Sequence, residues 1–262
     1  SVSGVIPVLK FGNKYLNPHP NLLTYLVQER LYDMLSTVSI SFETKFGKVF
    51  EEYISLLISD LENVEILKEE QIREKYNFQG KVCDYLIEFN DSILLLEIKA
   101  VKYTKKILNL DNIRESNSSR KVAKAFDQIV NVARNCKGKT KKDIYGICVT
   151  YGQLMFANLE PYFSNAVLPN MKETYKEIST YLIVPPQVLS IGDFEEFIGI
   201  IAGQKKTPKI VFEDFNGVLH DAGLNWRQYL YKTYVNVIDS YETVLSKRYK
   251  KYFEDLEIPY PE

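Results

Sequence analysis

Residues 81–100, KVCDYLIEFNDSILLLEIKA, constrain the fold of this chain most strongly. Two apolar runs, Val82–Phe89 and Ile93–Ala100, flank the polar break Asn90-Asp91-Ser92. Each run has the length of a strand and is rich in Ile, Leu, Val, Tyr and Phe, so the segment predicts a β-hairpin. Asn90 and Asp91 both tolerate the positive φ of a two-residue turn. With this turn, counting outward along the two strands pairs Asp84 with Glu97.

This register places three ionisable side chains on one face of the hairpin. The carboxylates of Asp84 and Glu97 would face each other with Cβ atoms ~5 Å apart and would repel. Lys99 lies on the same face because side chains alternate along a strand. Both faces are otherwise mostly apolar, which favours a central hairpin covered on both sides. A divalent cation held by oxygen ligands would compensate the charges, and the alternative is a Lys–carboxylate ion-pair network at a strand end.

Asp84 followed by Glu97-Ile98-Lys99 resembles the signature of the PD-(D/E)xK nuclease superfamily, which has the restriction-endonuclease-like fold. The resemblance implies Mg²⁺, with Mn²⁺ able to substitute, bound by Asp84, Glu97 and the backbone carbonyl of Ile98. It also implies that Lys99 lies near the attacking water. Cys83 occupies the position of the proline that gives the signature its name.

A helix predicted from Thr44 to about Asn63 carries two adjacent acids. Its apolar periodicity puts Glu52 on the polar side and Glu51 at the border of the buried side, where an unpaired acid is rare. The pattern Gly47-x-x-Phe50-Glu51-x-x-Ile54 resembles the first helix of many PD-(D/E)xK families, whose acid reaches the metal directly or through water. The resemblance therefore implies a metal-site role for Glu51 and none for Glu52. The alternative is that Glu51 is a boundary residue paired with a lysine.

Charge is segregated along the chain although the net charge is only −1. Residues 1–98 hold nine basic and 15 acidic side chains, whereas residues 99–142 hold 13 basic and three acidic ones. A basic segment beside an acidic metal site suits the binding of a polyphosphate. The alternative is a solvated helix face with a charged loop. The candidate nucleic-acid-binding residues are Lys102, Lys105, Lys106, Arg120, Lys121 and Lys124.

The remaining elements follow from apolar periodicity and from breaks in it. We predict helices over Leu22–Val38, Arg120–Asn135 and Ser190–Ala202. The predicted strands beyond the hairpin are Val64–Ile72, Asp143–Tyr151 and Tyr181–Val184. A strand–helix–strand passage implies a right-handed crossover, with 143–151 joining the sheet in parallel. Residues 203–215 are predicted to be a linker.

Gln128 borders the buried stripe of the predicted 120–135 helix. Its context, Gln128-Ile129-x-x-Val132-Ala133, resembles the Gln-x-x-x-Tyr helix of several nuclease families, with Val132 in place of Tyr. The resemblance implies that Gln128 helps to orient the lysine or the substrate. A plain boundary glutamine is an equal alternative.

The tail from about residue 216 is predicted to be helical and is rich in aromatic residues. Tyr231, Tyr234, Val235, Ile238, Tyr241 and Val244 recur at helical spacing, which is typical of a core or a partner interface. Interleaved Tyr and Lys side chains could alternatively stack bases and hold phosphates.

Composition excludes several classes of protein. The three cysteines lack metal-binding spacing, and His19 and His220 lie far apart, which argues against disulfides, zinc and histidine-based sites. No apolar run approaches the ~20 residues of a membrane span, and there is no secretory signal. These features predict a cytoplasmic protein in a reducing environment. The chain begins with Ser1 and not Met, as a fragment of a longer protein would.

The combined prediction is an α/β protein with a restriction-endonuclease-like mixed central sheet flanked by helices and an α-helical C-terminal extension. Its segments are an N-terminal scaffold (1–43), the nuclease core (44–202) and the helical extension (203–262). The expected function is that of a Mg²⁺-dependent endonuclease acting on DNA rather than RNA, in bacterial restriction or anti-phage defence by analogy. The alternative is a catalytically silent nucleic-acid-binding or assembly module. A homo-oligomer or a partner protein bound through the C-terminal helices is compatible with either.

Overall fold

The computed structural model describes residues 9–11, 14–16, 32, 35, 41–101, 117–152, 177–222, 226–238, 247, 250 and 251. Its contacts divide the chain into two compact units, residues 1–49 and 50–262. In the first unit β1 (Leu9–Phe11) pairs antiparallel with β2 (Lys14–Leu16). The predicted helix at 22–38 lies outside the described residues, apart from single helical positions at 32 and 35. The predicted segment boundaries at 43/44 and 202/203 stay predictions.

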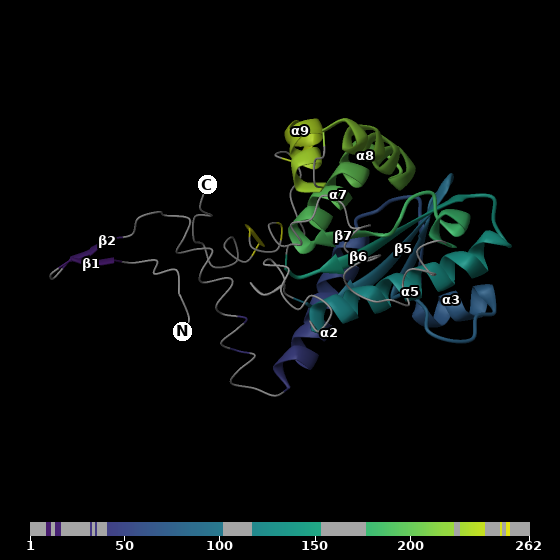
Figure 1. Ribbon diagram of the computed structural model, residues 1–262, viewed down its shortest axis with the longest axis horizontal. Coiled ribbons are helices and arrows are strands. Elements are labelled where there is room, and N and C mark those ends of the chain that lie inside the picture. The colour runs from purple at the N-terminus through teal and green to yellow at the C-terminus, as the bar shows by residue number, and fades with distance from the viewer. Residues whose placement is uncertain are drawn as a thin grey trace. The chain divides into compact units, whose positions relative to one another are not determined.

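The second unit is built on a mixed five-stranded sheet with the strand order β3-β4-β5-β6-β7 (Figure 1). The strands are β3 (Glu65–Lys68), β4 (Tyr85–Glu88), β5 (Ser92–Lys99), β6 (Asp143–Thr150) and β7 (Gln187–Ser190). The pairs β3–β4 and β4–β5 are antiparallel, whereas β5–β6 and β6–β7 are parallel. This arrangement confirms the predicted α/β class with a mixed central sheet.

The central hairpin has the predicted register. Tyr85 pairs with Leu96 and Glu88 with Ile93, so the next pair outward is Asp84 with Glu97. The Phe89 N–H donates to the Ser92 carbonyl over 2.8 Å and closes the two-residue turn. Every residue of β5 from Ser92 to Ile98 is buried, as expected for a strand covered on both faces.

Helices cover both faces of the sheet (Figure 1). On one face α3 (Glu69–Tyr76) and α5 (Asn117–Lys137) share a buried cluster with Leu86, Ile93 and Leu95 of the hairpin. On the other face α8 (Pro208–Ala222) packs against β5 and β6, and its Phe212 stacks on Tyr145 of β6 with ring centroids 4.8 Å apart. The helices α2 (Phe42–Ile58), α5 and α7 (Ile191–Gln204) confirm three predicted helices, with ends that differ by a few residues.

The predicted strand at 64–72 is half wrong, because the chain turns into α3 after Lys68. The Gln71 side chain accepts a hydrogen bond from the Lys68 N–H over 2.9 Å, which stabilises a helix start. Glu69 and Glu70 fall in the first helical turn, where the helix dipole favours acids. Asn77 ends the helix in the left-handed conformation at φ 46°. Ile72 faces the core from α3 and not from a strand.

The strand predicted at 181–184 is also wrong. Tyr181 ends a helical turn, and the strand β7 begins at Gln187, after Pro185-Pro186 rather than before them. Leu182 is buried in the same core cluster as α5, which explains its apolar character without a strand. Proline is compatible with a position just before an edge strand because no ladder hydrogen bond is lost there.

Residues 208–215, predicted as part of a linker, instead open α8. Pro208 occupies the first helical position, where its missing N–H costs nothing, and Val211, Phe212 and Phe215 are buried at helical spacing. Among the side chains of α9 (Trp226–Ile238) that the structure describes, Trp226, Tyr229, Leu230 and Tyr234 are buried. Tyr231 and Val235, predicted within the buried stripe, are each 42% exposed.

The rings of Trp226, Tyr229 and Tyr234 therefore belong to a core rather than to a surface for stacking bases, whereas Tyr231 is exposed. Trp226 stacks on Phe215 with centroids 3.9 Å apart and meets Phe197 and Phe212 edge to face. Such pairs add to the free energy of burying the rings. In the part of the chain that the structure describes, no helix is both long and apolar enough to cross a membrane.

Gly146→Ala should destabilise the protein by about 1–3 kcal/mol, because the new methyl group overfills the core. A Cβ atom at position 146 would lie 2.5 Å from Ile129 Cγ2 of α5. Gly138→Ala is the matched control, since a Cβ there meets nothing within 4 Å. Urea denaturation measures both, and equal stability of the two variants would contradict this packing.

Candidate functional site

Asp84 and Glu97 meet at the open end of the central hairpin, where each carboxylate bonds the backbone of the opposite strand. Asp84 Oδ2 accepts a hydrogen bond from the Ile98 N–H over 2.6 Å. Glu97 Oε2 accepts one from the Asp84 N–H over 3.2 Å. These two bonds orient both acids and bring them to one edge of the sheet.

Lys99 completes a three-residue cluster on this edge. Its ammonium forms an ion pair with Glu97 Oε1. The Glu97 side chain is 1% exposed and the Lys99 side chain 22%, so the pair is held mostly away from water. The structure thus brings together Asp84, Glu97 and Lys99, the three residues singled out by the hairpin register.

Both carboxyl groups titrate well above their ordinary range. Burial raises the pKa of Asp84 to about 6, against the opposing effects of the Ile98 N–H and Lys99. Burial and the neighbouring Asp84 raise the pKa of Glu97 to about 7, although Lys99 opposes this. The effect of burial on these pKa values therefore exceeds the stabilisation that the Lys99 ammonium gives to the two carboxylates. A further cation at the site would favour their charged forms.

The pKa of Lys99 is raised, although burial of a lysine normally lowers it. Burial alone would lower the pKa of Lys99, but its ion pair with Glu97 and the charge of Asp84 outweigh that effect and raise it. The side chain therefore stays protonated at neutral pH. Its chemistry here is that of a fixed positive charge and hydrogen-bond donor.

Glu51 approaches this cluster from α2 but remains exposed. Its helix is placed at the same edge of the sheet, because Phe50 packs edge to face on Tyr151, one residue beyond the Thr150 that pairs with Lys99. The negative charge of Glu51 contributes to the raised pKa of Asp84. Within the described ranges, however, no three His, Cys, Asp or Glu side chains lie close enough to form a metal-binding group.

Glu69 is an acid near the cluster that sequence reasoning missed. It is the first residue of α3, and its charge also raises the pKa of Asp84. The signal available in the sequence was the Glu69-Glu70-Gln71 run, which is typical of a helix start. Because residues 64–72 were predicted to form one continuous strand, the helix start at Glu69 was not predicted.

Gln128 of α5 contacts the segment that leads to Asp84. Its Nε2 donates to the Val82 carbonyl over 3.0 Å, two residues before the acid. The structure thus places this side chain against the backbone of the site segment. The proposed role in orienting the lysine or substrate stays a prediction.

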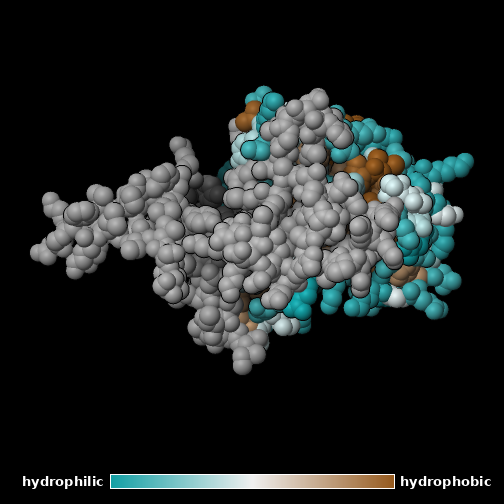
Figure 2. Space-filling view, viewed as in Figure 1, coloured by the Kyte–Doolittle hydropathy of each residue, from teal (hydrophilic) through white to brown (hydrophobic). Residues whose placement is uncertain are grey.

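The candidate nucleic-acid-binding residues divide into two groups. Arg120 and Lys124 are exposed on α5 and Lys121 is partly exposed, whereas Lys102, Lys105 and Lys106 lie outside the described residues. Where grey atoms leave it visible, the surface near α3 in Figure 2 is mostly hydrophilic. This surface is suited to a charged partner.

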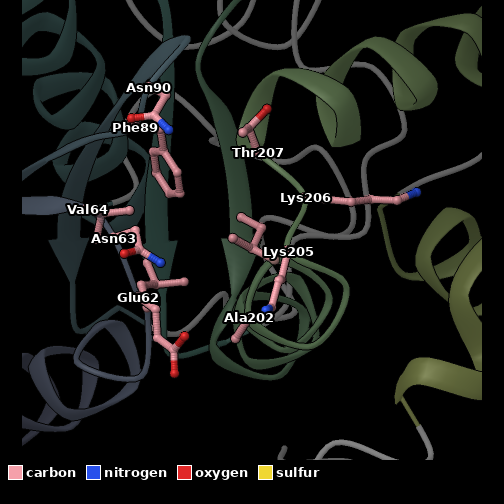
Figure 3. A pocket seen from close by; sticks show the side chains of 11 residues that line it. Glu62, Asn63, Val64, Phe89, Asn90, Ala202, Lys205, Lys206 and Thr207 are labelled. Atoms are coloured by element: carbon pink, nitrogen blue, oxygen red, sulfur yellow. The ribbon is translucent and has the colours of Figure 1, made fainter.

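A cavity of about 210 Å³ lies at the opposite end of the hairpin. Asn63, Phe89, Asn90 and Lys205 are among the residues that line it (Figure 3). It is separated from the Asp84–Glu97 edge by the length of β5, roughly 20 Å at about 3.3 Å per residue. Its charged lining mixes Glu62 with Lys205 and Lys206 and offers no paired carboxylates, so the hairpin's open edge is the stronger candidate site.

Comparisons with known proteins add little to the geometry. No protein-family model matches the chain, and a search of curated proteins finds no match. Among solved structures, the chain is similar to the small subunit (R.BspD6I2) of the heterodimeric restriction endonuclease R.BspD6I. The identity is 13% and the TM-score 0.35, over 80% of this chain and 96% of that one. A likeness this low carries no conclusion about the activity of this chain.

Proposed function

We propose that this chain is a metal-dependent endonuclease that hydrolyses phosphodiester bonds, those of DNA in the first place. The observation that carries the proposal is the convergence of two buried carboxylates and an ion-paired lysine at one end of a central hairpin. Asp84, Glu97 and Lys99 have both the order and the register of the PD-(D/E)xK signature. Restriction or anti-phage defence is the setting that the resemblance suggests.

The donor set fits a hard divalent cation. Mg²⁺, or Mn²⁺ in its place, would be held by the carboxylates of Asp84 and Glu97 and the carbonyl of Ile98, with Glu51 as a further or outer acid. Burial raises the pKa values of Asp84 and Glu97 and so disfavours their charged forms, and a bound cation would stabilise the two carboxylates there. When bound, such a cation lowers the pKa of a water molecule and neutralises charge that develops on the phosphoryl oxygens.

Other residues of the chain would orient the water, hold the carboxylates and bind the nucleic acid. Lys99, protonated at neutral pH, orients the attacking water or stabilises the charge of the transition state. The Ile98 and Asp84 N–H groups keep the two carboxylates in place. Arg120, Lys121 and Lys124 on α5, with Lys102, Lys105 and Lys106 before it, would bind the phosphate backbone of the nucleic acid.

The test is cleavage of supercoiled plasmid, linear DNA and RNA with Mg²⁺ or Mn²⁺, set beside the Asp84→Ala variant. We expect metal-dependent cutting of DNA by the wild-type protein and none by Asp84→Ala. Cleavage of RNA but not of DNA would show that the substrate is RNA. Equal cleavage by the wild type and by Asp84→Ala would contradict the proposed site.

Glu51→Gln is expected to lower kcat about tenfold, as the loss of an outer ligand typically does, whereas Glu52→Gln leaves it unchanged. Both residues are exposed neighbours on α2, so the pair controls for general effects on the helix. Steady-state cleavage of a short duplex measures the difference. Equal rates for the two variants would contradict a site role for Glu51.

A second function is favoured by one specific observation. Arg120 and Lys124 are exposed on α5 and could bind phosphates without any metal, so the alternative is a non-cleaving nucleic-acid-binding or assembly module. That module would bind DNA in a salt-dependent manner and would show no Mg²⁺ or Mn²⁺ binding by calorimetry.

Tyr231 and Val235 are both exposed on α9, on either side of a kink at Tyr234, and such apolar exposure suits a contact with a second copy or a partner protein. Activity that appears only with such a partner would show as inactivity of the isolated chain.

A further inference from the structure

Asp84 is the last residue of a loop that lacks regular secondary structure. Residues 77–84 connect α3 to β4, and two of them have left-handed or otherwise restricted backbone, Asn77 at φ 46° and Gly80 at φ 125°. A loop of this kind does not by itself hold a carboxylate to within a fraction of an ångström. Catalytic groups need that accuracy from surrounding bonds.

Arg73 of α3 ties this loop to its own helix. Its Nη1 donates to the Gly80 carbonyl, and its Nη2 bonds Glu69 Oε1 over 2.5 Å, one helical turn back. A planar guanidinium can make two directed bonds of this kind, which a lysine ammonium cannot reproduce with the same geometry. The direction of the Gly80 carbonyl depends on the glycine, because L side chains rarely adopt φ 125°.

A second side chain holds the same loop from another helix. Gln128 of α5 donates to the Val82 carbonyl over 3.0 Å. The Val82 carbonyl is therefore hydrogen-bonded to α5, and the Gly80 carbonyl is hydrogen-bonded to α3. Both helices belong to the buried cluster beneath the hairpin, so the loop is braced against the core on two sides.

We propose that Arg73 is a positioning residue for the site: by holding the Gly80 carbonyl it restrains the loop that leads into Asp84, and its bond to Glu69 anchors the guanidinium on α3. The inference rests on the proposed nuclease function for its effect on catalysis. The bracing of the loop itself is independent of that function and is measured separately.

The test compares Arg73→Met with Lys75→Met in the full chain. Lys75 lies on the same helix, and Lys75→Met removes two ion pairs, to Glu65 and Glu88 at 2.6 and 2.7 Å, whose acids are on β3 and β4 and not in the loop. We expect Arg73→Met to lower kcat roughly tenfold with KM for duplex DNA within about twofold. Hydrogen–deuterium exchange of the peptide spanning residues 78–86 should accelerate several-fold in Arg73→Met and not in Lys75→Met.

A conservative variant keeps the test decisive. Arg73→Lys retains a cation beside Glu69 but cannot bond both partners in the same geometry, so it should fold normally and show intermediate kcat and exchange. If Arg73→Met fails to fold, Arg73→Lys carries the comparison. Unchanged exchange in the 78–86 peptide, or an effect of Lys75→Met equal to that of Arg73→Met, would overturn the proposal.

Failure of the nuclease function and failure of the Arg73 role would give different results. A wild-type protein that neither cleaves DNA nor binds Mn²⁺ contradicts the proposed function, whereas the exchange result still decides whether Arg73 braces the loop. Normal cleavage by Arg73→Met with normal exchange contradicts the positioning role and leaves the nuclease function standing.

Discussion

Lys99→Ala protein is expected to lose DNA cleavage by a factor of roughly 10³. The side chain is the single cation within the described cluster, and removing one donor that stabilises transition-state charge typically costs that much. Binding of DNA should persist, because binding draws on many phosphate contacts of which this is at most one. Gel-based cleavage of supercoiled plasmid with Mg²⁺, beside a salt titration of DNA binding, measures both quantities.

The fold should tolerate this substitution. Glu97 would lose its ion pair in a buried position, but the pKa of Glu97 already lies near 7, so the acid can take up a proton instead of remaining as an unpaired charge. Lys142→Ala is a suitable control, since that lysine bonds Glu88 and the Phe89 carbonyl at the turn end of the hairpin. Vigorous Mg²⁺-dependent cutting by Lys99→Ala protein would refute the assigned role.

The metal-free protein is expected to lose stability as the pH rises from about 4 to about 8. The folded-state pKa values of Asp84 and Glu97, about 6 and about 7, exceed their ordinary values of 3.8 and 4.5. In that window the folded state binds more protons than the unfolded state, so the free energy of unfolding falls as the pH rises. At about 1.4 kcal/mol per pKa unit, the two shifts together correspond to a loss on the order of 6 kcal/mol.

Two comparisons isolate this effect in urea denaturation at pH 5 and pH 8. Asp84→Asn should flatten the dependence, because an amide can replace the protonated acid without titrating. Mg²⁺ should stabilise the wild-type protein at pH 8 and much less at pH 5, where protons compete for the carboxylates. A protein that is most stable at pH 8 in the absence of metal, with the same slope in Asp84→Asn, would contradict the described electrostatics.

The hairpin and its charged face could be predicted from sequence because both depend on local rules. A two-residue turn at Asn90-Asp91 sets the register, and the alternation of side chains along a strand then puts Lys99 beside Glu97. The helix containing Gln128 was predictable for the same reason, since its buried stripe repeats at helical spacing.

Other features depend on contacts between distant segments and were not predictable in this way. The apolar residues of 181–184 suggested a strand, yet Leu182 packs into the core from outside the sheet. Phe212 and Phe215 were hidden within a segment whose Gly, Lys and Pro residues favour a linker, and only the tertiary partners Tyr145 and Trp226 explain their burial. The bond from Arg73 to the Gly80 carbonyl likewise depends on where α3 begins.

The most direct test of the central claim is a calorimetric titration of Mn²⁺ into the metal-free protein at pH 6.5, with Asp84→Asn beside the wild type. We expect saturable binding by the wild type with release of protons, because Asp84 and Glu97 are partly protonated at that pH, and loss of binding in Asp84→Asn. Undiminished binding by Asp84→Asn, or no binding by a wild-type protein that still binds DNA, would contradict it.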